Sequence, residues 1–173
     1  TCSLRRIGQL KNLRSDLNIK DIRGNVETRM GKVHSGEYDA IVLAAAGLIR
    51  LKYDITKYYK FSFDEMLPAP GQGALAVEIR KDNEELEDIL TKIDNTNIRK
   101  SVEVEREILN NIGGGCSIPI GVIVFSNTDL LNTIACIVDP QTGEKTIIKE
   151  TNWQGQGKEL AKIVSKQLLS NGG

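Results

Sequence analysis

Apolar residues recur every three or four positions in several segments, which is the spacing of a helix with one buried face. In the first segment the apolar positions are 4, 7, 10 and 13, and Ser3 offers a capping side chain, so we predict a helix over 4–14. The pattern from Val26 to Val33 indicates a second helix, which ends before Gly36. Similar patterns predict further helices over 45–51, 83–93, 96–112 and 157–169.

Runs that are continuously apolar, or that alternate with polar residues, predict strands. The run at 39–44 is continuous, as in a buried parallel strand, and Pro140–Gly143 has the composition of a hairpin turn. The predicted strands are 18–22, 39–44 and 74–79 in the first half of the chain, and 119–125, 130–138 and 145–151 in the second. Alternating helices and strands indicate a partial doubly wound α/β domain, followed by a small α+β domain with a three-stranded antiparallel sheet and helices.

Positive charge is concentrated in the first third of the chain. The 173 residues have no net charge, but residues 1–60 contain 12 Lys and Arg against 6 Asp and Glu. Because the aromatic residues in this part are not interleaved with the arginines, we expect a small anionic ligand and no nucleic acid. No apolar run reaches the roughly 20 residues of a membrane span, no metal-ligand spacing occurs, and three widely spaced cysteines indicate reduced thiols in the cytoplasm.

Four arginines fall where α/β proteins bind anions. Arg5 and Arg6 begin the first predicted helix, where they oppose the helix dipole unless an anion compensates them. Arg23 follows a predicted strand, and Arg29 lies in the first turns of the next helix. The hydroxyls of Thr1 and Ser3 lie next to the first pair in sequence. A solvated basic face remains the alternative interpretation.

One cysteine lies in a glycine-rich loop. Cys116 follows Gly113, Gly114 and Gly115 and precedes Pro119, so the loop can adopt positive φ angles and present a thiol to a ligand. The alternative is a small buried cysteine after a helix that glycine terminates. We expect Cys136 to lie in the core and His34, a poor base candidate for Cys116, to lie on the surface. We expect 105–107 on a helix surface or in interdomain ion pairs.

Several stretches occur in the order found in one enzyme family. They are TCSLRR (1–6), DIRGNVETR (21–29), GEYDAIVLAAAGLIRL (36–51), LPAPGQGALAVEIR (67–80), VEREIL (104–109) and GGGCSIPIG (113–121). With these motifs the chain resembles the porphobilinogen deaminase (hydroxymethylbilane synthase) family. The resemblance implies a transferase that condenses four porphobilinogen units into hydroxymethylbilane and releases ammonia at each condensation.

The resemblance also implies roles for individual residues. Cys116 would hold a dipyrromethane cofactor through a thioether, and Gln72 would lie in the hinge between domains. The remaining implied residues bind carboxylates or donate hydrogen bonds beside them: Thr1, Ser3, Arg5, Arg6, Arg23 and Arg29. This chain departs from the family at Cys2, where serine is common, and at Ser117, where glutamine is common. The family's catalytic aspartate would precede Thr1, so we expect no catalytic residue in this chain and no activity from the chain alone.

The resemblance divides the chain into three parts. Residues 1–73 would be the family's second domain, of periplasmic-binding-protein-like architecture and without its first strand. Residues 74–93 would belong to an absent first domain, and 94–173 would form the C-terminal domain with the cofactor cysteine. The family is monomeric and binds porphobilinogen and the growing polypyrrole. Two alternatives remain: a non-catalytic polycarboxylate-binding module of solute-binding-protein architecture and, more weakly, a cysteine hydrolase, which lacks a credible histidine.

Overall fold

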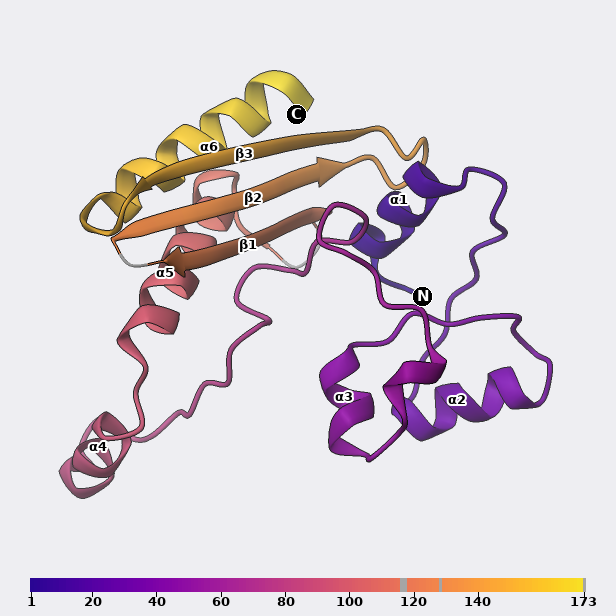
Figure 1. Cartoon of the computed structure of the whole chain (residues 1–173), viewed down its shortest axis with the longest axis horizontal. Coiled ribbons are helices and arrows are strands. Elements are labelled where there is room, and N and C mark those ends of the chain that lie inside the picture. Colours follow the sequence, from indigo (N-terminus) through magenta and orange to yellow (C-terminus); the bar gives the residue numbers. More distant parts are fainter. Residues whose placement is uncertain (116–117, 128, 173) are drawn as a thin grey trace. The chain divides into compact units, whose positions relative to one another are not determined.

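The computed structural model describes residues 1–115, 118–127 and 129–172 of the chain, which form two compact units (Figure 1). The first unit comprises Thr1–Met66 together with Val138–Lys145. The second unit comprises Leu67–Ile137 together with Thr146–Gly173. None of the helices in the described residues combines the length and apolar character that crossing a bilayer requires.

The first unit is built from short helices joined by long loops. Its elements are α1 (Leu4–Leu13), α2 (Val26–His34), α3 (Ala45–Arg50) and the 3-10 turn η1 (Ile55–Lys57). These bounds confirm the three helices predicted here. Polar side chains cap the first two, because Ser3 precedes α1 and Asn25 precedes α2 with its side chain accepting from Thr28 N. The buried apolar side chains are few and include Ile22, Met30 and Leu48.

Helix α1 packs against the turn at Val138–Lys145. Asn12 Nδ2 donates to Gly143 O at 2.9 Å, and Lys11 Nζ donates to Gln141 O at 2.9 Å. The turn approaches closely because Gly143 has a φ of +81°, and a Cβ there would lie 2.8 Å from the backbone of α1. The predicted hairpin turn is therefore confirmed, and it also anchors the helix that begins the candidate site.

The strands predicted at 18–22, 39–44 and 74–79 are wrong for this structure. The described residues of these segments have extended or irregular backbone and form no strand. A strand exists only where a neighbour supplies a hydrogen-bonded ladder, and an apolar run indicates burial without supplying that neighbour. Leu75 and Val77 are not buried at all, at 87% and 64% exposure. The doubly wound arrangement of this region stays a prediction.

The second unit contains a three-stranded antiparallel sheet with helices, as predicted. Its elements are α4 (Glu84–Thr91), α5 (Thr96–Asn111), β1 (Ile120–Asn127), β2 (Leu130–Val138), β3 (Lys145–Trp153), the 3-10 turn η2 (Gln154–Gln156) and α6 (Gly157–Gly172). The strand order is β1-β2-β3, and the antiparallel register places Val122 opposite Ala135. The three strands and three helices predicted for this region are confirmed.

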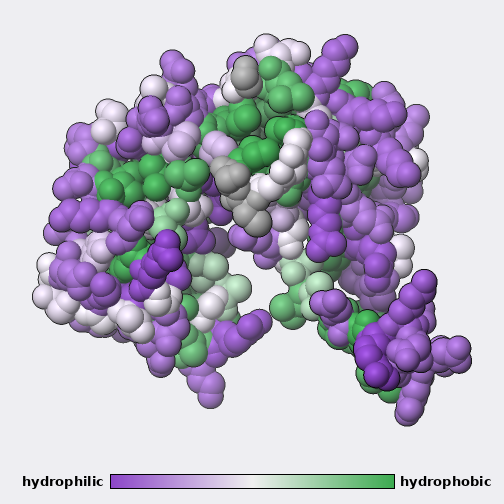
Figure 2. Space-filling model, turned by 180° about the vertical axis from the view of Figure 1, so that it is seen from behind, coloured by the Kyte–Doolittle hydropathy of each residue, from purple (hydrophilic) through white to green (hydrophobic). Residues whose placement is uncertain are grey.

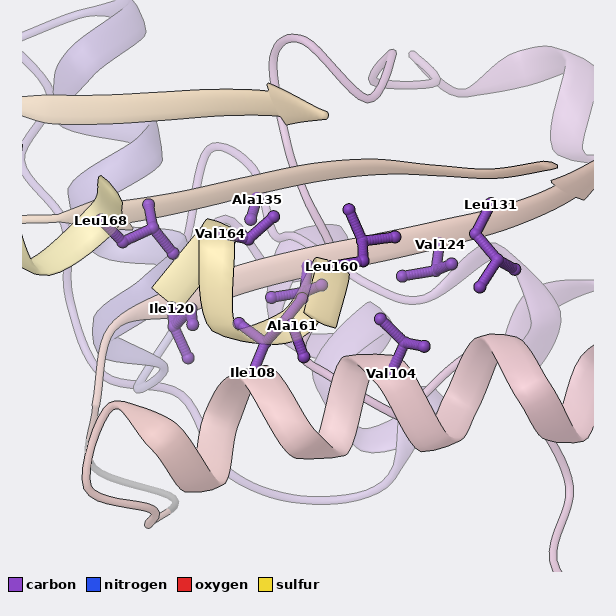
Figure 3. Close-up of a cluster of buried hydrophobic side chains, with 11 residues drawn as sticks. Val104, Ile108, Ile120, Val124, Leu131, Ala135, Leu160, Ala161, Val164 and Leu168 are labelled. Atoms are coloured by element: carbon purple, nitrogen blue, oxygen red, sulfur yellow. The ribbon is translucent and has the colours of Figure 1, made fainter. Parts of the chain in front are cut away.

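One face of the sheet forms the core with α5 and α6 (Figure 3). Val122 and Ala135 are fully buried between the sheet and the helices, as are Ile108 of α5 and Val164 of α6. These residues recur at helical spacing in α5 and α6 and at alternate positions in β1 and β2, so each element contributes one apolar side. On the opposite face, Gly121 leaves room for Leu67, whose Cβ would lie 2.6 Å from a Cβ at that glycine.

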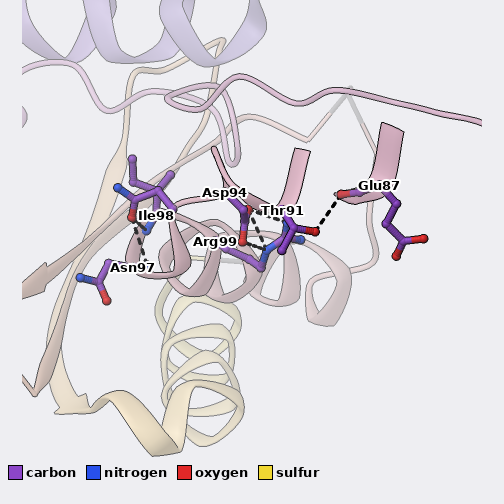
Figure 4. A network of polar contacts seen from close by, with 7 residues as sticks. Glu87, Thr91, Asp94, Asn97, Ile98 and Arg99 are labelled. Carbon is purple, nitrogen blue, oxygen red and sulfur yellow. Dashed lines mark hydrogen bonds and ion pairs between the residues drawn. The ribbon is translucent and has the colours of Figure 1, made fainter. Parts of the chain in front are cut away.

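Polar contacts fix the turn between α4 and α5 (Figure 4). Asn95 caps α5 by accepting from Asn97 N and Ile98 N at 3.1 Å. Asp94 and Arg99 form an ion pair with an O–N distance of 2.6 Å. Because both charges are accessible to solvent, this pair orients the two side chains and adds little to the free energy of unfolding.

A buried carboxylate ties residues 67–73, the crossover before α4, to the sheet. Glu105 of α5 accepts from Gly71 N at 2.7 Å and from Val124 N at 2.9 Å, and the side chain is only 7% exposed. Nearby, Val122 N donates to Pro68 O at 2.9 Å, so the crossover also covers the free edge of β1. The expectation that Glu105 lies on a helix surface or in an interdomain ion pair is therefore wrong. It shares a helix stripe with buried Ser101 and Ile108, a spacing that was visible in the sequence.

We expect Thr133→Val to stabilise the chain. Among the described residues, Thr133 has a buried hydroxyl oxygen without a hydrogen-bond partner. Because valine has nearly the same shape and no polar atom, the free energy of unfolding should rise by about 1–2 kcal/mol in urea titrations. Thr133→Ser, which keeps the hydroxyl and loses the methyl group, should lower it. A destabilised valine variant would show that the hydroxyl has a partner.

We expect Glu105→Gln to lower the free energy of unfolding by about 1–3 kcal/mol at acidic pH, because an amide has one acceptor oxygen for the two backbone donors, whereas the carboxyl group places an oxygen beside each of them. Burial raises the pKa of Glu105 above its ordinary value of 4.5, against the opposing effect of the Gly71 and Val124 N–H groups. The folded chain therefore holds this proton where the unfolded chain has lost it, and the associated stability falls as pH rises from about 4.5 through the raised pKa.

Urea titrations across this pH range should show the difference between the original chain and E105Q narrowing as pH increases. Glu103→Gln, at an exposed position of the same helix, should change stability by less than about 0.5 kcal/mol at each pH. A difference that widens with pH would contradict the raised pKa of Glu105.

Candidate functional site

The candidate site begins at the N-terminus of α1. Ser3 Oγ accepts from Arg6 N at 3.4 Å, and Thr1 Oγ1 accepts from Ser3 N at 3.3 Å. These hydroxyls satisfy backbone donors that the helix itself leaves open. The positive end of the helix dipole also lies here, so this end of α1 favours a negatively charged group.

Arg6 is a partly buried cation beside a second cation. Its Nη1 donates to Val42 O at 2.9 Å, which fixes the guanidinium against the 39–44 segment. Burial lowers the pKa of Arg6, and the neighbouring positive charge of Arg29 lowers it further. Within the described part of the chain, neither arginine forms an ion pair with a carboxylate. Two cations held together in this way favour an anionic ligand.

Arg29 is held by the loop that precedes its own helix. Its Nε donates to Gly24 O at 2.6 Å, and Gly24 has a φ of +118°. Asn25 Oδ1 accepts from Thr28 N at 2.8 Å, which fixes the start of α2. The bond from Nε does not use the two terminal nitrogens of Arg29, which form the planar fork that binds a carboxylate through two parallel hydrogen bonds.

The other two predicted arginines have different environments. Arg5 lies on the buried side of α1 and is 8% exposed, whereas Arg23 is exposed on the loop before α2. The structure thus joins Thr1, Ser3 and Arg6 through hydrogen bonds, and the charge of Arg29 is close enough to lower the pKa of Arg6. The sequence analysis did not identify Tyr38, whose hydroxyl donates to Asp21 O at 2.5 Å. No motif signals such a contact, because it joins a side chain to a backbone carbonyl 17 residues away.

The predicted cofactor cysteine, Cys116, and Ser117 lie outside the described residues. The glycines before them have positive φ angles, +111° at Gly113, +52° at Gly114 and +147° at Gly115, as the sequence predicts. Cys136 is fully buried, as expected for a core residue.

Gln72, the predicted hinge residue, is exposed and directly follows Gly71, which Glu105 holds. In the described part of the chain, no group of three His, Cys, Asp or Glu residues is arranged to bind a metal ion.

Two family models match consecutive parts of the chain. The model described as porphobilinogen deaminase, dipyromethane cofactor binding domain, matches residues 1–88. The model described as porphobilinogen deaminase, C-terminal domain, matches residues 99–170. The arginine site lies entirely within the first match, and Cys116 lies within the second.

Curated relatives carry the same name. Proteins named porphobilinogen deaminase from Geobacillus kaustophilus, Acidothermus cellulolyticus and Geobacillus sp. (strain WCH70) are 42%, 46% and 41% identical over 96%, 99% and 99% of this chain. The aligned regions cover 55%, 53% and 55% of those relatives, so the chain spans about half their length. From the two matching family models, the chain belongs to the porphobilinogen deaminase family.

Proposed function

We propose that this chain contributes the cofactor- and substrate-carboxylate-binding part of a hydroxymethylbilane synthase, which condenses four porphobilinogen units with release of ammonia. The observation that carries the proposal is the partly buried Arg6 guanidinium beside Arg29, without a carboxylate partner among the described residues. Membership of the porphobilinogen deaminase family supplies the reaction class. The same membership favours an enzyme over a non-catalytic polycarboxylate-binding module.

The chemistry of the ligand fits the cations of the first unit. Each ring derived from porphobilinogen carries an acetate and a propionate, so a growing chain accumulates carboxylates. Arg6 and Arg29 bind these groups as planar forks, and exposed Arg23 extends the same set. Arg5 lies on the buried side of α1, so it contributes positive charge to the site more than a direct contact with the ligand. Thr1 and Ser3 add hydroxyl groups at this end of the helix.

We further propose that Cys116 anchors the dipyrromethane through a thioether. Sulfur is a soft nucleophile suited to the pyrrole-methylene carbon: a C–S bond forms there, the C–N bond to the amino group breaks, and the thiol proton leaves with ammonia. When bound, the dipyrromethane supplies the pyrrole end onto which substrate units are added. The glycines at 113–115 allow a bulky group to approach this position, because they present no Cβ.

We propose the roles of the remaining parts from the resemblance to the family. Residues 1–73 form the second domain, 94–173 form the C-terminal domain, and Gln72 lies in the hinge. Residues 74–93 pack against the family's first domain. Support comes from their apolar side chains, since Leu75 and Val77 are exposed and Figure 2 shows green, apolar residues at the surface around α4 at lower right. We propose that the whole protein is a cytoplasmic monomer.

We predict that the 173-residue chain alone does not polymerise porphobilinogen. No aspartate of this chain lies in a motif that matches the family's catalytic aspartate, so the positive charge that develops on each reacting pyrrole lacks its stabilising carboxylate. Porphobilinogen would be incubated with the chain, and porphyrin would be measured by absorbance after acid oxidation. A full-length relative serves as the positive control. Sustained turnover by the isolated chain would contradict this part of the proposal.

We predict that any covalent dipyrromethane is found on Cys116 and nowhere else. Intact mass and peptide mapping should locate the added mass on the peptide that contains this residue, in a chain co-expressed with the rest of the enzyme. Cys116→Ser should abolish the addition, because an alcohol is a weaker nucleophile than a thiol. Cys2→Ser, a change at an exposed thiol, is the matched control and should retain it. An addition that persists in C116S would refute the assignment.

A further inference from the structure

Tyr38 occupies a fixed position after α2. Its backbone N–H donates to Lys32 O at 3.3 Å, and the Lys32 ammonium lies 5.7 Å from the centre of the Tyr38 ring. Lys32 also forms an ion pair with Glu37 at 2.9 Å. The ring is therefore restrained by its backbone and by a cation–π contact, so the direction of its hydroxyl is defined.

The Tyr38 hydroxyl holds the loop that presents Arg23. It donates to Asp21 O at 2.5 Å, and Arg29 Nε donates to Gly24 O at 2.6 Å. Arg23 thus lies between two carbonyl groups that are each fixed by a side chain. The side chain of Ile22, at 3% exposure, anchors the same loop into the unit. The described residues of this loop have irregular backbone, so no hydrogen bonds of a helix or strand restrain it.

We propose that Tyr38 is a positioning residue for carboxylate binding, which acts by fixing the backbone of Asp21–Arg23 so that the Arg23 guanidinium is preorganised for the ligand. This inference rests on the proposed function, since it requires that the arginines of the first unit bind carboxylates. A preorganised cation loses less freedom when the ligand binds, so the hydroxyl raises affinity without touching the ligand.

The test is Tyr38→Phe, which removes one oxygen and leaves the ring beside Lys32. Binding of porphobilinogen, a dicarboxylate, to the 173-residue chain would be measured by isothermal titration calorimetry. We expect the dissociation constant to rise about 3- to 10-fold, the range for losing one hydrogen bond. Tyr53→Phe is the matched control, because Tyr53 is also half-buried in the first unit, and its affinity should not change.

A double-mutant cycle with Arg23→Ala separates positioning from general stability. If Tyr38 acts through Arg23, Y38F should weaken binding in the original chain and have little effect in the R23A background. Equal losses in both backgrounds would overturn the inference, as would an unchanged affinity of Y38F. Failure of Y38F to fold, seen by circular dichroism, would also overturn it, because the hydroxyl would then be needed for the fold itself.

An Arg29→Ala variant distinguishes this inference from the proposed function. Weaker binding in R29A together with unchanged binding in Y38F would leave the carboxylate site standing and remove the role of Tyr38. Unchanged binding in R29A, or no binding by the original chain, would instead contradict the proposed site, and the role of Tyr38 would fall with it.

Discussion

The partial burial of the Arg6 guanidinium beside the like charge of Arg29 is the constraint on which the candidate site depends. Removing a cation from water costs several kcal/mol, and a hydrogen bond to a charged group returns only about 1.5–3 kcal/mol. The bond from Arg6 to Val42 O therefore offsets part of that cost. The positive end of α1, in contrast, increases the cost of holding a cation there. An anion offsets the cost of burying Arg6, the repulsion between Arg6 and Arg29, and the unfavourable position of a cation at the helix start. In the proposed site the ligand would supply this negative charge, since the ion pairs of the described residues include no carboxylate partner for Arg6 or Arg29.

The second unit contains the opposite arrangement, a carboxylate held by backbone donors. Glu105 accepts from Gly71 N and Val124 N, so one side chain joins the crossover, α5 and β1. Val124 belongs to the apolar core that α5 and α6 form on one face of the sheet. The crossover meanwhile covers the β1 edge through Pro68 O and places Leu67 over Gly121. Gln72 directly follows Gly71, the crossover residue that Glu105 holds, and this position agrees with the hinge proposed there.

Local patterns predicted the helices and the three strands of the second unit well, because each element shows its buried side at a regular spacing. They failed at 18–22, 39–44 and 74–79, where an apolar run indicated burial and a ladder partner could not be inferred from it. Motifs identified Arg6 and Arg29, but their proximity depends on the folded arrangement of the first unit. The contact from Tyr38 to Asp21 O was not predictable, since a backbone carbonyl has no sequence signature. Glu105 was predictable in principle from its spacing with Ser101 and Ile108.

The geometry of Arg29 suits an arginine at this position better than a lysine. Its Nε is bonded to Gly24 O, at 2.6 Å, and this bond fixes the orientation of the guanidinium plane. The two terminal nitrogens then point from a rigid plane, in the spacing that a carboxylate accepts. A lysine ammonium has three donors around one rotating centre, so it could reach both groups but would not present a rigid planar fork to the carboxylate. In the proposed site, Arg29 would therefore link the loop that presents Arg23 to the ligand, so that loop order and carboxylate affinity depend on the same side chain.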